Sequence, residues 1–370
     1  MKKKILFLIH DLGQGGAEKV LVNLVNNMDP EQFDITVIAL FGGGVNAQFL
    51  APHVRLITWF PWEFRGNSHV MKLLSPKQLH RLIVREHYDI EVAYLEGPAS
   101  RVISGCTDPN TKTVCWIHCT MKTEQAFSVG FRDFAEAKRS YGSFDRSIFV
   151  SWDVMDAFAA FCATDTMQVC YNTNETAKMV EKAREAVSGE LFRPEEFHLI
   201  GMGKLVPIKG FDRLARIHKR LREEGYPVHT WLLGVGEEEQ KLRTFARENG
   251  LEESFTLLGY QTNPYKYVSK CDLFVCSSHS EGFSTAATEA LIVGTPVCTV
   301  EVSGMKEMLG EHNEYGLVTE NDENALYQGI KKLLDDPQLL KHYKNQAALR
   351  GKDFSTEETV RAVEEMLLNL

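Results

Sequence analysis

Two glutamates flank the start of a predicted helix in the segment CDLFVCSSHSEGFSTAATEALIVGTPV. Glu281 precedes the helix expected over residues 284–293, and Glu289 lies on its second turn. The first backbone N–H groups of a helix have no partner within it, so those at Phe283–Thr285 are free to attract anions. Carboxylates beside such a turn are suited to binding sugar hydroxyls next to a phosphate group. The same spacing alone is also typical of two solvated surface acids.

Two lysines follow an apolar segment in GMGKLVPIKGF. Lys204 comes shortly after the strand expected over residues 199–202, and Lys209 stands five positions further on. Two ammonium groups at the end of a strand are suited to a diphosphate, because each lysine supplies a compact positive charge. The pair taken alone equally fits a solvated basic loop.

A glycine-rich loop, GQGGAEK, lies between the first expected strand and the first helix. Gly13, Gly15 and Gly16 allow a ligand to approach the backbone closely at a helix start. A dinucleotide-binding site would place an acidic residue at the end of the next strand. The strand expected over residues 35–40 is instead followed by Phe41 and three glycines, which disfavours a nicotinamide dehydrogenase. The loop then either contacts a phosphate or an acceptor, or is only a tight turn.

Apolar segments alternate with amphipathic ones along the whole chain. Strands that are apolar throughout and alternate with helices indicate parallel sheets covered on both faces. The predicted fold class is therefore α/β, with two doubly wound Rossmann-like domains facing each other across a cleft. We expect a first domain over residues 1–175, a linker over 176–195 and a second domain over 196–354. Ligands of such folds bind at the carboxyl ends of the strands, where the glutamates and lysines described above fall.

Composition and charge exclude several classes of protein. The 370 residues include 41 Lys and Arg against 50 Asp and Glu, a net charge of -9, which disfavours general binding to nucleic acids. No run approaches ~18 apolar residues, so no membrane-spanning helix is expected, and the apolar start Ile5–Ile9 is interpreted as a strand and not a leader. The eight cysteines include no pair with two-residue spacing, and Asp-x-Asp is absent, so no metal site is predicted.

The order of these segments resembles the retaining glycosyltransferases of family 4, which are nucleotide-sugar enzymes with the two-domain GT-B fold. The resemblance covers most of the second domain, through GKLVPIKGF, LLGVGEEEQKL, FTLLGYQTNPY, the two-glutamate segment and SGMKEMLGEHNEYGLV. In the first domain it is looser, through QGGAEK, WIHCT and VCYNTNET. It implies that residues 1–175 take the acceptor, that 196–354 bind the donor, and that a C-terminal helix over 355–370 returns to the first domain.

The resemblance also implies roles for individual residues. Lys204 and Lys209 match the basic pair that grips the donor diphosphate, with Lys204 where the family more often has arginine. Glu281 matches the acid beside the donor sugar, and Glu289 matches the acid that accepts hydrogen bonds from the ribose hydroxyls. His118, in WIHCT, matches a histidine near the reacting sugar. The implied catalytic residues are thus Glu281, His118, Lys209 and Lys204.

The remaining implied residues surround the donor. Gly16 matches the loop that approaches the diphosphate or the acceptor, while Gly234 and Tyr260 border the nucleobase. Backbone groups of four successive residues would hold sugar hydroxyls and phosphate, namely Gly282, Phe283, Ser284 and Thr285. Ser284 stands where many relatives have Gly or Pro, and that difference bears on sugar selection.

The implied chemistry is transfer of a hexose from a nucleotide sugar through an oxocarbenium-like state. The two lysines and the helix N-terminus stabilise the leaving diphosphate, so no metal or other cofactor is expected. The favoured donor is a UDP-sugar. The acceptor is a glycan or a lipid-linked glycan of cell-surface polysaccharide synthesis, handled in the cytoplasm with peripheral membrane association left open.

Two segments of the first domain are candidates for the acceptor or a membrane face: the aromatic stretch TWFPWEFR at 58–65 and the basic helix at 77–86. Packing into the domain would equally explain the aromatic stretch, and a solvated helix face would equally explain the basic helix. Two other functions stay open, a GT-B sugar-nucleotide epimerase or hydrolase and a non-catalytic nucleotide-sugar or glycan-binding protein. A degenerate binder would be expected to lose one of the two lysines or two glutamates, and all four positions are filled.

Overall fold

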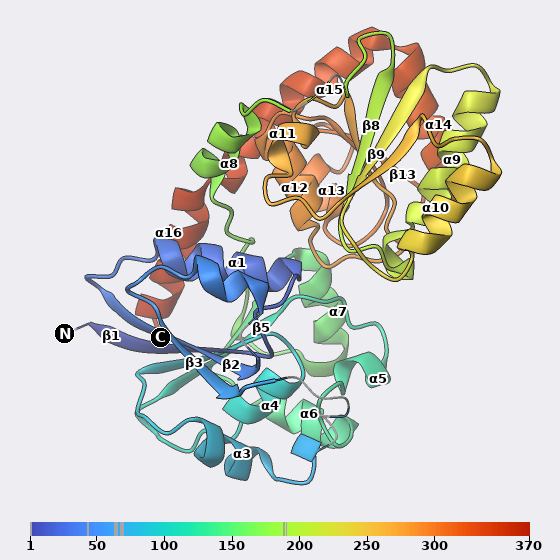
Figure 1. Cartoon of the computed structure of the whole chain (residues 1–370). Coiled ribbons are helices and arrows are strands. Elements are labelled where there is room, and N and C mark those ends of the chain that lie inside the picture. Colours follow the sequence, from blue (N-terminus) through green and yellow to red (C-terminus); the bar gives the residue numbers. More distant parts are fainter. Residues whose placement is uncertain (1, 43, 63–65, 67–69, 188, 190) are drawn as a thin grey trace. The chain divides into compact units, whose positions relative to one another are not determined.

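The computed structural model describes residues 2–42, 44–62, 66, 70–187, 189 and 191–370. The chain forms two compact units, unit 1 from Met1–Asn174 with Thr356–Leu370, and unit 2 from Glu175–Ser355 (Figure 1). Each unit is built on its own parallel β-sheet with helices around it. The predicted α/β class with two Rossmann-like domains is therefore confirmed.

Unit 1 contains a sheet that has seven strands within the described residues, in the order β3-β2-β1-β4-β5-β6-β7. The strands are β1 (Lys3–Ile9), β2 (Phe33–Phe41), β3 (Arg55–Phe60), β4 (Ile90–Tyr94), β5 (Lys112–Ile117), β6 (Arg146–Phe149) and β7 (Met167–Val169). The strand order reverses between β1 and β4, because β1 to β3 extend the sheet one way and β4 to β7 the other. Residues Ile5–Ile9 of β1 are fully buried, as expected for a central strand covered on both faces.

Helices cover both faces of this sheet (Figure 1). They are α1 (Gly16–Asn27), α3 (Pro76–Ile83), α4 (Pro98–Ile103), α5 (Glu124–Phe127), α6 (Phe134–Tyr141), α7 (Trp152–Cys162) and α16 (Thr356–Leu368), with a 3₁₀ turn η1 (Val45–Phe49). Figure 1 shows α1 and α16 on one face and α3, α4 and α6 on the other. The last helix is tied to unit 1 by Lys3 Nζ, which donates to Leu367 O at 3.1 Å, and by the Asp29 N–H, which donates to Glu364 Oε1 at 2.6 Å.

Unit 2 contains a sheet that has six strands within the described residues, in the order β10-β9-β8-β11-β12-β13. The strands are β8 (Phe197–Met202), β9 (Val228–Leu233), β10 (Phe255–Gly259), β11 (Leu273–Cys276), β12 (Val297–Val300) and β13 (Leu317–Thr319). The order reverses between β8 and β11, which are hydrogen-bonded neighbours. Doubly wound sheets bind their ligands at such a reversal, outside the carboxyl ends of the two strands.

The helices of unit 2 form layers on its sheet. They are α8 (Thr176–Ala183), α9 (Phe211–Glu223), α10 (Glu239–Glu248), α11 (Tyr265–Val268), α12 (Thr285–Ile292), α13 (Met305–Leu309), α14 (Glu323–Asp335) and α15 (Pro337–Arg350), with 3₁₀ turns η2 (Pro207–Lys209) and η3 (Gly351–Phe354). In Figure 1, α9, α10 and α14 lie together on one face, and α8, α11 and α12 on the other. Part of the segment expected as a linker, 176–195, is α8, which packs into unit 2 through Met179 and Ala183 against Tyr265.

Local sequence signals account for several of these elements. Ser75 caps α3 by accepting the N–H of Gln78, whose side chain accepts the N–H of Ser75 in return, and Pro76 occupies the first turn. The basic helix expected over 77–86 is this helix, and it ends at Ile83. Across the described residues, no helix is both long enough and apolar enough to cross a bilayer.

The aromatic stretch expected over 58–65 lies only partly within the described residues. Trp59 and Phe60 belong to β3, where their rings pack against each other and against Phe41. Trp62 is 61% exposed. Residues 63–65 lie outside the described residues.

Candidate functional site

The two lysines lie directly beyond β8, at the reversal of strand order in unit 2. Lys204 is exposed, and within the described residues its side chain has no hydrogen bond or ion pair. Lys209 ends the short 3₁₀ turn η2 and is partly buried. Gly210 follows with φ of +61°, and a Cβ there would stand 2.1 Å from Ser277 O. Glycine is therefore required for the lysine loop to lie against the segment that follows β11.

Lys209 and Glu281, which come from opposite sides of this reversal, form an ion pair. The Lys209 Nζ lies 2.7 Å from Glu281 Oε1 and 2.9 Å from Oε2. The exposed fraction of the two side chains is 28% and 10% respectively. The sequence pattern assigned one residue to the diphosphate and the other to the sugar, and it gave no sign that they contact each other.

Two further side chains fix the Glu281 carboxylate. Ser278 Oγ donates to Glu281 Oε1 at 2.6 Å. The Cys276 sulfur lies 4.0 Å from the same oxygen, and burial raises the pKa of the Cys276 thiol, which keeps it protonated as a weak donor. A small hollow lined by Met202, Lys209, Phe274, Ser284 and other residues opens beside this carboxylate. The carboxylate is thus oriented before any ligand arrives.

Arg213 is a functional candidate that the sequence analysis missed. Its side chain, on α9, is buried and donates to Ser277 O at 2.6 Å and to Ser278 O at 2.7 Å. It also donates to Asn321 Oδ1 at 2.9 Å, and Asn321 Nδ2 reaches His279 O at 3.3 Å. Arg213 therefore holds the loop that carries Ser278 and Glu281. Its position four residues before Ile217 and eight before Leu221, on the apolar side of the helix, was the signal for a buried arginine.

The turn before α12 presents backbone groups beside Glu281. Ser284 is the N-cap, and its Oγ accepts the N–H of Ala287 at 3.3 Å. Phe283 is buried and packs edge-on against Phe354, with ring centroids 5.9 Å apart. Gly304, with φ of +77°, backs the turn, since a Cβ there would lie 2.8 Å from the Phe283 ring. The backbone of Gly282–Thr285 is therefore held by packing on its far side.

Glu289 lies on the second turn of α12 and is buried, with an exposed fraction of 5%. The Tyr265 hydroxyl donates to Glu289 Oε1 at 3.4 Å. A buried carboxylate is costly unless it is hydrogen-bonded, so the Glu289 carboxylate favours hydrogen-bond donors beside it. Vicinal ribose hydroxyls are donors of that kind.

Two glycine turns extend the sheet beyond β8 and β9. Gly203 N donates to Leu233 O and Leu205 N donates to Val235 O, each at 2.9 Å. A Cβ on Gly234 would stand 1.9 Å from Gly203 O, and Gly234 has φ of +136°. Any side chain at Gly234 would therefore force apart the loop that carries Lys204. Tyr260, after β10, is 52% exposed.

His118 and Gly16 belong to unit 1, which is described by itself. His118 follows β5 and is buried, its ring 4.7 Å from that of Tyr94 between centroids. Its backbone N–H donates to Glu96 Oε2 at 2.9 Å, while its Nε2 is buried and has no hydrogen-bond partner among the described residues. Burial lowers the pKa of His118 to about 3, so the ring is neutral near pH 7. Gly16 is exposed at the start of α1.

Two polar atoms from rings that contact His118 are, within the described residues, also buried without a hydrogen-bond partner. They are Tyr94 Oη and Trp116 Nε1, and the two rings lie 4.9 Å apart. Such groups are costly to bury and indicate a place that water or a ligand would satisfy. The sequence pattern did not indicate a functional role for Tyr94 or Trp116, nor for Glu96.

The structure thus brings together Lys209, Glu281 and the turn Gly282–Thr285, with Lys204 and Glu289 on the neighbouring loop and helix. Gly234 borders the Lys204 loop. The combination is positive charge, the backbone N–H groups of a helix start and oriented carboxylates at the reversal between β8 and β11. It fits an anion joined to a polyhydroxyl group.

Comparisons with known proteins agree with this geometry. Residues 183–350 match the family model described as "Glycosyl transferases group 1", and residues 14–177 match "Glycosyltransferase Family 4". The structure superposes on the crystal structure of HepE from Anabaena in complex with UDP with a TM-score of 0.78, covering 100% of both chains at 21% identity. That likeness supports the fold.

Two curated relatives come from bacteria. A Campylobacter jejuni protein is 34% identical over 203 residues, 54% of this chain, and is named "N-acetylgalactosamine-N,N'-diacetylbacillosaminyl-diphospho-undecaprenol 4-alpha-N-acetylgalactosaminyltransferase". The match spans 53% of that relative's length. An uncharacterised glycosyltransferase of Haemophilus influenzae is 22% identical over 97% of this chain and 98% of its own length. With two family models that together extend from residue 14 to residue 350, the chain is a glycosyltransferase of the family 4 type.

Proposed function

We propose that the chain transfers a hexose from a UDP-sugar to a glycan or lipid-linked acceptor, with retention at the anomeric carbon and without a metal ion. The observation that carries the proposal is the group formed by Lys209, Glu281 and the turn before α12 at the reversal of strand order in unit 2. In this proposal the diphosphate lies against the lysines and the turn, and the sugar lies beside Glu281.

Lys209 is able to serve the diphosphate while still holding Glu281. An ammonium group has three N–H donors, and two of them are directed to the oxygens of Glu281. The third donor is left for a phosphate oxygen. As the bond to the anomeric carbon breaks, negative charge grows on the diphosphate, and Lys209, Lys204 and the backbone N–H groups of Gly282–Thr285 stabilise it.

Glu281 is an electrostatic and binding group in this mechanism. Its carboxylate is already paired with Lys209 and hydrogen-bonded by Ser278, which makes it a poor nucleophile although it keeps its negative charge. A fixed negative charge beside the donor sugar stabilises the positive charge of the oxocarbenium-like state. The leaving phosphate itself takes the acceptor proton, so that attack occurs on the face from which the diphosphate departs.

The metal-free route is supported by the donor set. The charge that a divalent cation would neutralise is instead met by Lys204 and Lys209. Lysine does this as a point charge and without fixed geometry.

The donor and acceptor classes are supported by the relatives. The Anabaena HepE structure is a complex with UDP, and a second structure of HepE is a complex with UDP-glucose. The Campylobacter relative is named for a diphospho-undecaprenol acceptor. We assign the acceptor to unit 1, where the unsatisfied Nε2 of His118 is a neutral hydrogen-bonding group for a sugar hydroxyl.

Nucleotide binding tests the donor assignment without knowledge of the acceptor. Thermal unfolding is followed with UDP, GDP and ADP at equal concentrations, since a ligand of the folded state raises Tm by mass action. We expect UDP to give the largest rise, and Glu289→Gln to reduce it. An equal or larger rise with GDP or ADP would contradict the UDP assignment.

Turnover separates the transferase from the two other functions. The protein is incubated with UDP-glucose, UDP-galactose or UDP-N-acetylglucosamine and a crude lipid-linked glycan fraction from bacteria, and the products are separated. We expect UDP release that depends on the lipid fraction and a product with the α-anomeric linkage. Release of UDP without any acceptor would favour a hydrolase. Interconversion of the UDP-sugars would favour an epimerase, and binding with neither reaction would favour a non-catalytic protein.

A further inference from the structure

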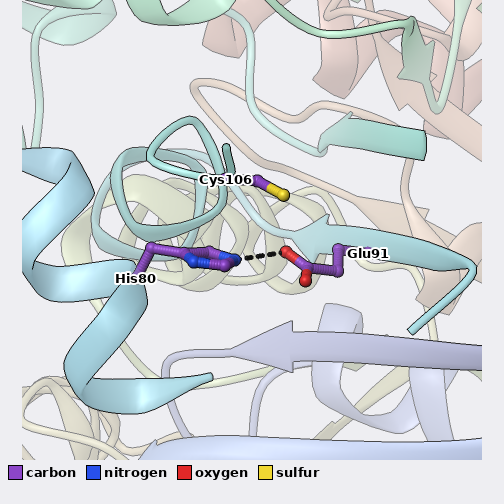
Figure 2. A group of neighbouring side chains, drawn as sticks. All are labelled: His80, Glu91 and Cys106. Carbon is purple, nitrogen blue, oxygen red and sulfur yellow. Dashed lines mark hydrogen bonds and ion pairs between the residues drawn. The ribbon is translucent and has the colours of Figure 1, made fainter. Parts of the chain in front are cut away.

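Three side chains of the types that bind transition metals meet in unit 1, and none of them has a part in the proposed reaction. His80 comes from α3, Glu91 from β4, and Cys106 from the turn directly after α4 (Figure 2). One ligand atom of each lies within 4.8 Å of the other two. Figure 2 shows the Glu91 carboxylate and the Cys106 sulfur on the same side of the His80 ring, with a hydrogen bond drawn between His80 and Glu91.

The position of Glu91 is unusual for a carboxylate. β4 is a central strand that is buried along its whole length, and its other residues are Ile90, Val92, Ala93 and Tyr94. The exposed fraction of the Glu91 side chain is 3%, and within the described part of the chain its one partner is His80, with Nε2 2.7 Å from Oε2. An ionised carboxylate in such a place needs strong compensation from neighbouring charge.

A metal ion would hold all three side chains at once, which the His80 ring alone does not do. A ring nitrogen carries one proton or one lone pair, so it serves either the carboxylate or the sulfur at one time. A metal ion accepts the imidazole nitrogen, the carboxylate oxygen and the thiolate together. Cysteine sulfur is a soft ligand that excludes Mg²⁺ and Ca²⁺, and the mixed N, O and S set is typical of Zn²⁺.

The spacing is close to that of a zinc site. Bonds of about 2.0–2.3 Å in tetrahedral geometry place neighbouring ligand atoms roughly 3.3–3.6 Å apart. The His80–Glu91 contact of 2.7 Å would open by less than about 1 Å, and the longer separations, at most 4.8 Å, would close by up to about 1.5 Å. The His80 side chain is 15% exposed and Cys106 is partly exposed, which gives an ion and water a route of entry.

We propose that His80, Glu91 and Cys106 form a zinc site that ties α3 and the end of α4 to the sheet of unit 1. The thiol of Cys106 gives up its proton to solvent on binding, and the fourth position is taken by water. None of the three ligands is among the residues that we assign to the donor or to the acceptor. Its function is to secure α3, a helix of eight residues that the sequence predicted as a possible acceptor or membrane face.

Cobalt is the probe for the thiolate ligand. The full-length protein is stripped with a chelator, exchanged into metal-free buffer and titrated with Co²⁺, whose bond to a thiolate gives a charge-transfer band in the near ultraviolet. We expect the band to saturate at one Co²⁺ per chain and to disappear on addition of Zn²⁺. Cys106→Ser and His80→Gln should abolish saturable binding, while Cys119→Ser, which removes the exposed cysteine, should leave it unchanged.

Protection of Cys106 tests the proposal in the unaltered chain, so that a variant that fails to fold does not decide the matter. Alkylation of each cysteine by iodoacetamide is followed by mass spectrometry with and without Zn²⁺. We expect Zn²⁺, but not Mg²⁺, to slow alkylation of Cys106 at least tenfold and to leave the rate at Cys119 unchanged. Equal rates at Cys106, or a cobalt band that persists in Cys106→Ser, would overturn the zinc site.

Discussion

Replacing Lys209 by methionine separates the structural effect of its ion pair from its effect on the reaction. Methionine keeps most of the length of the side chain and removes the charge, so Glu281 loses its cation and keeps the hydrogen bond from Ser278. Breaking a fully buried ion pair by removal of one partner costs about 3–5 kcal/mol. The Lys209 side chain is 28% exposed, and solvent screening reduces the expected loss to about 1–2 kcal/mol. For a unit of this size that corresponds to a fall in Tm of roughly 2–8 °C.

The double variant Lys209→Met, Glu281→Gln completes the comparison. Glutamine keeps the shape of Glu281 without its charge, so the double variant has no uncompensated carboxylate and should recover most of the lost stability. Turnover should not recover, because the cation that stabilises the leaving diphosphate is still missing. We expect a loss of at least about 2 kcal/mol of transition-state stabilisation, or about 30-fold in turnover, in both the single and the double variant.

The assay combines thermal unfolding with UDP release at saturating donor. Lys331→Met is a matched control, because the Lys331 Nζ lies 2.7 Å from Glu224 Oε2 with both side chains 32% exposed, in unit 2 but on α14. It should lower stability slightly and leave turnover unchanged. Turnover of Lys209→Met within fivefold of the unaltered chain, or its return in the double variant, would refute the role given to Lys209.

Three further predictions concern the metal, the ribose and acid stability. UDP release should persist in EDTA, and a loss that Mg²⁺ restores would exclude the metal-free mechanism. Glu289→Gln should weaken UDP binding, measured by calorimetry, more than it slows turnover at saturating donor. An unchanged affinity for UDP would contradict the proposed contact between Glu289 and the ribose. Burial lowers the pKa of His218 to about 3, whereas an unfolded histidine titrates near 6.5. The unfolded state therefore binds the extra proton between these values, so stability falls as pH decreases from about 6.5. In urea denaturation at pH 7 and pH 5, His218→Gln should lose less stability than the unaltered chain, and an equal loss would contradict this cause.

The sequence predicted that Lys204 and Glu281 follow the ends of strands, and in the structure they follow β8 and β11, but the contacts between the loops were not predicted. Lys204 and Glu281 fall after apolar segments, and parallel strands bring their carboxyl ends to one edge of the sheet. The pairing of Lys209 with Glu281 spans 72 positions and depends on η2 and on the close approach permitted by Gly210. No periodicity in the sequence encodes a contact between two loops.

Two charged residues lie inside apolar sequence patterns, and these patterns indicated buried charges that were not predicted. Arg213 lies within a basic helix and resembles its solvated neighbours, yet it alone among the arginines and lysines of α9 is buried. Glu91 interrupts the apolar segment of β4. In both cases a charge occupies a position where the fold buries its neighbours, and its compensation comes from elements that are distant in sequence. A charge at a core position is therefore the signal to examine first.

The discontinuity of unit 1 affects how the protein is made on the ribosome. α16 joins unit 1 only after Glu175–Ser355 has been synthesised. The hydrogen bond from the Asp29 N–H to Glu364, 335 positions later, therefore forms only at the end of synthesis. Unit 2, a continuous stretch of chain, has no such delay and is able to fold as it emerges. During that interval the face of unit 1 that α16 covers stays open, and it is the surface on which a chaperone would act on the nascent chain.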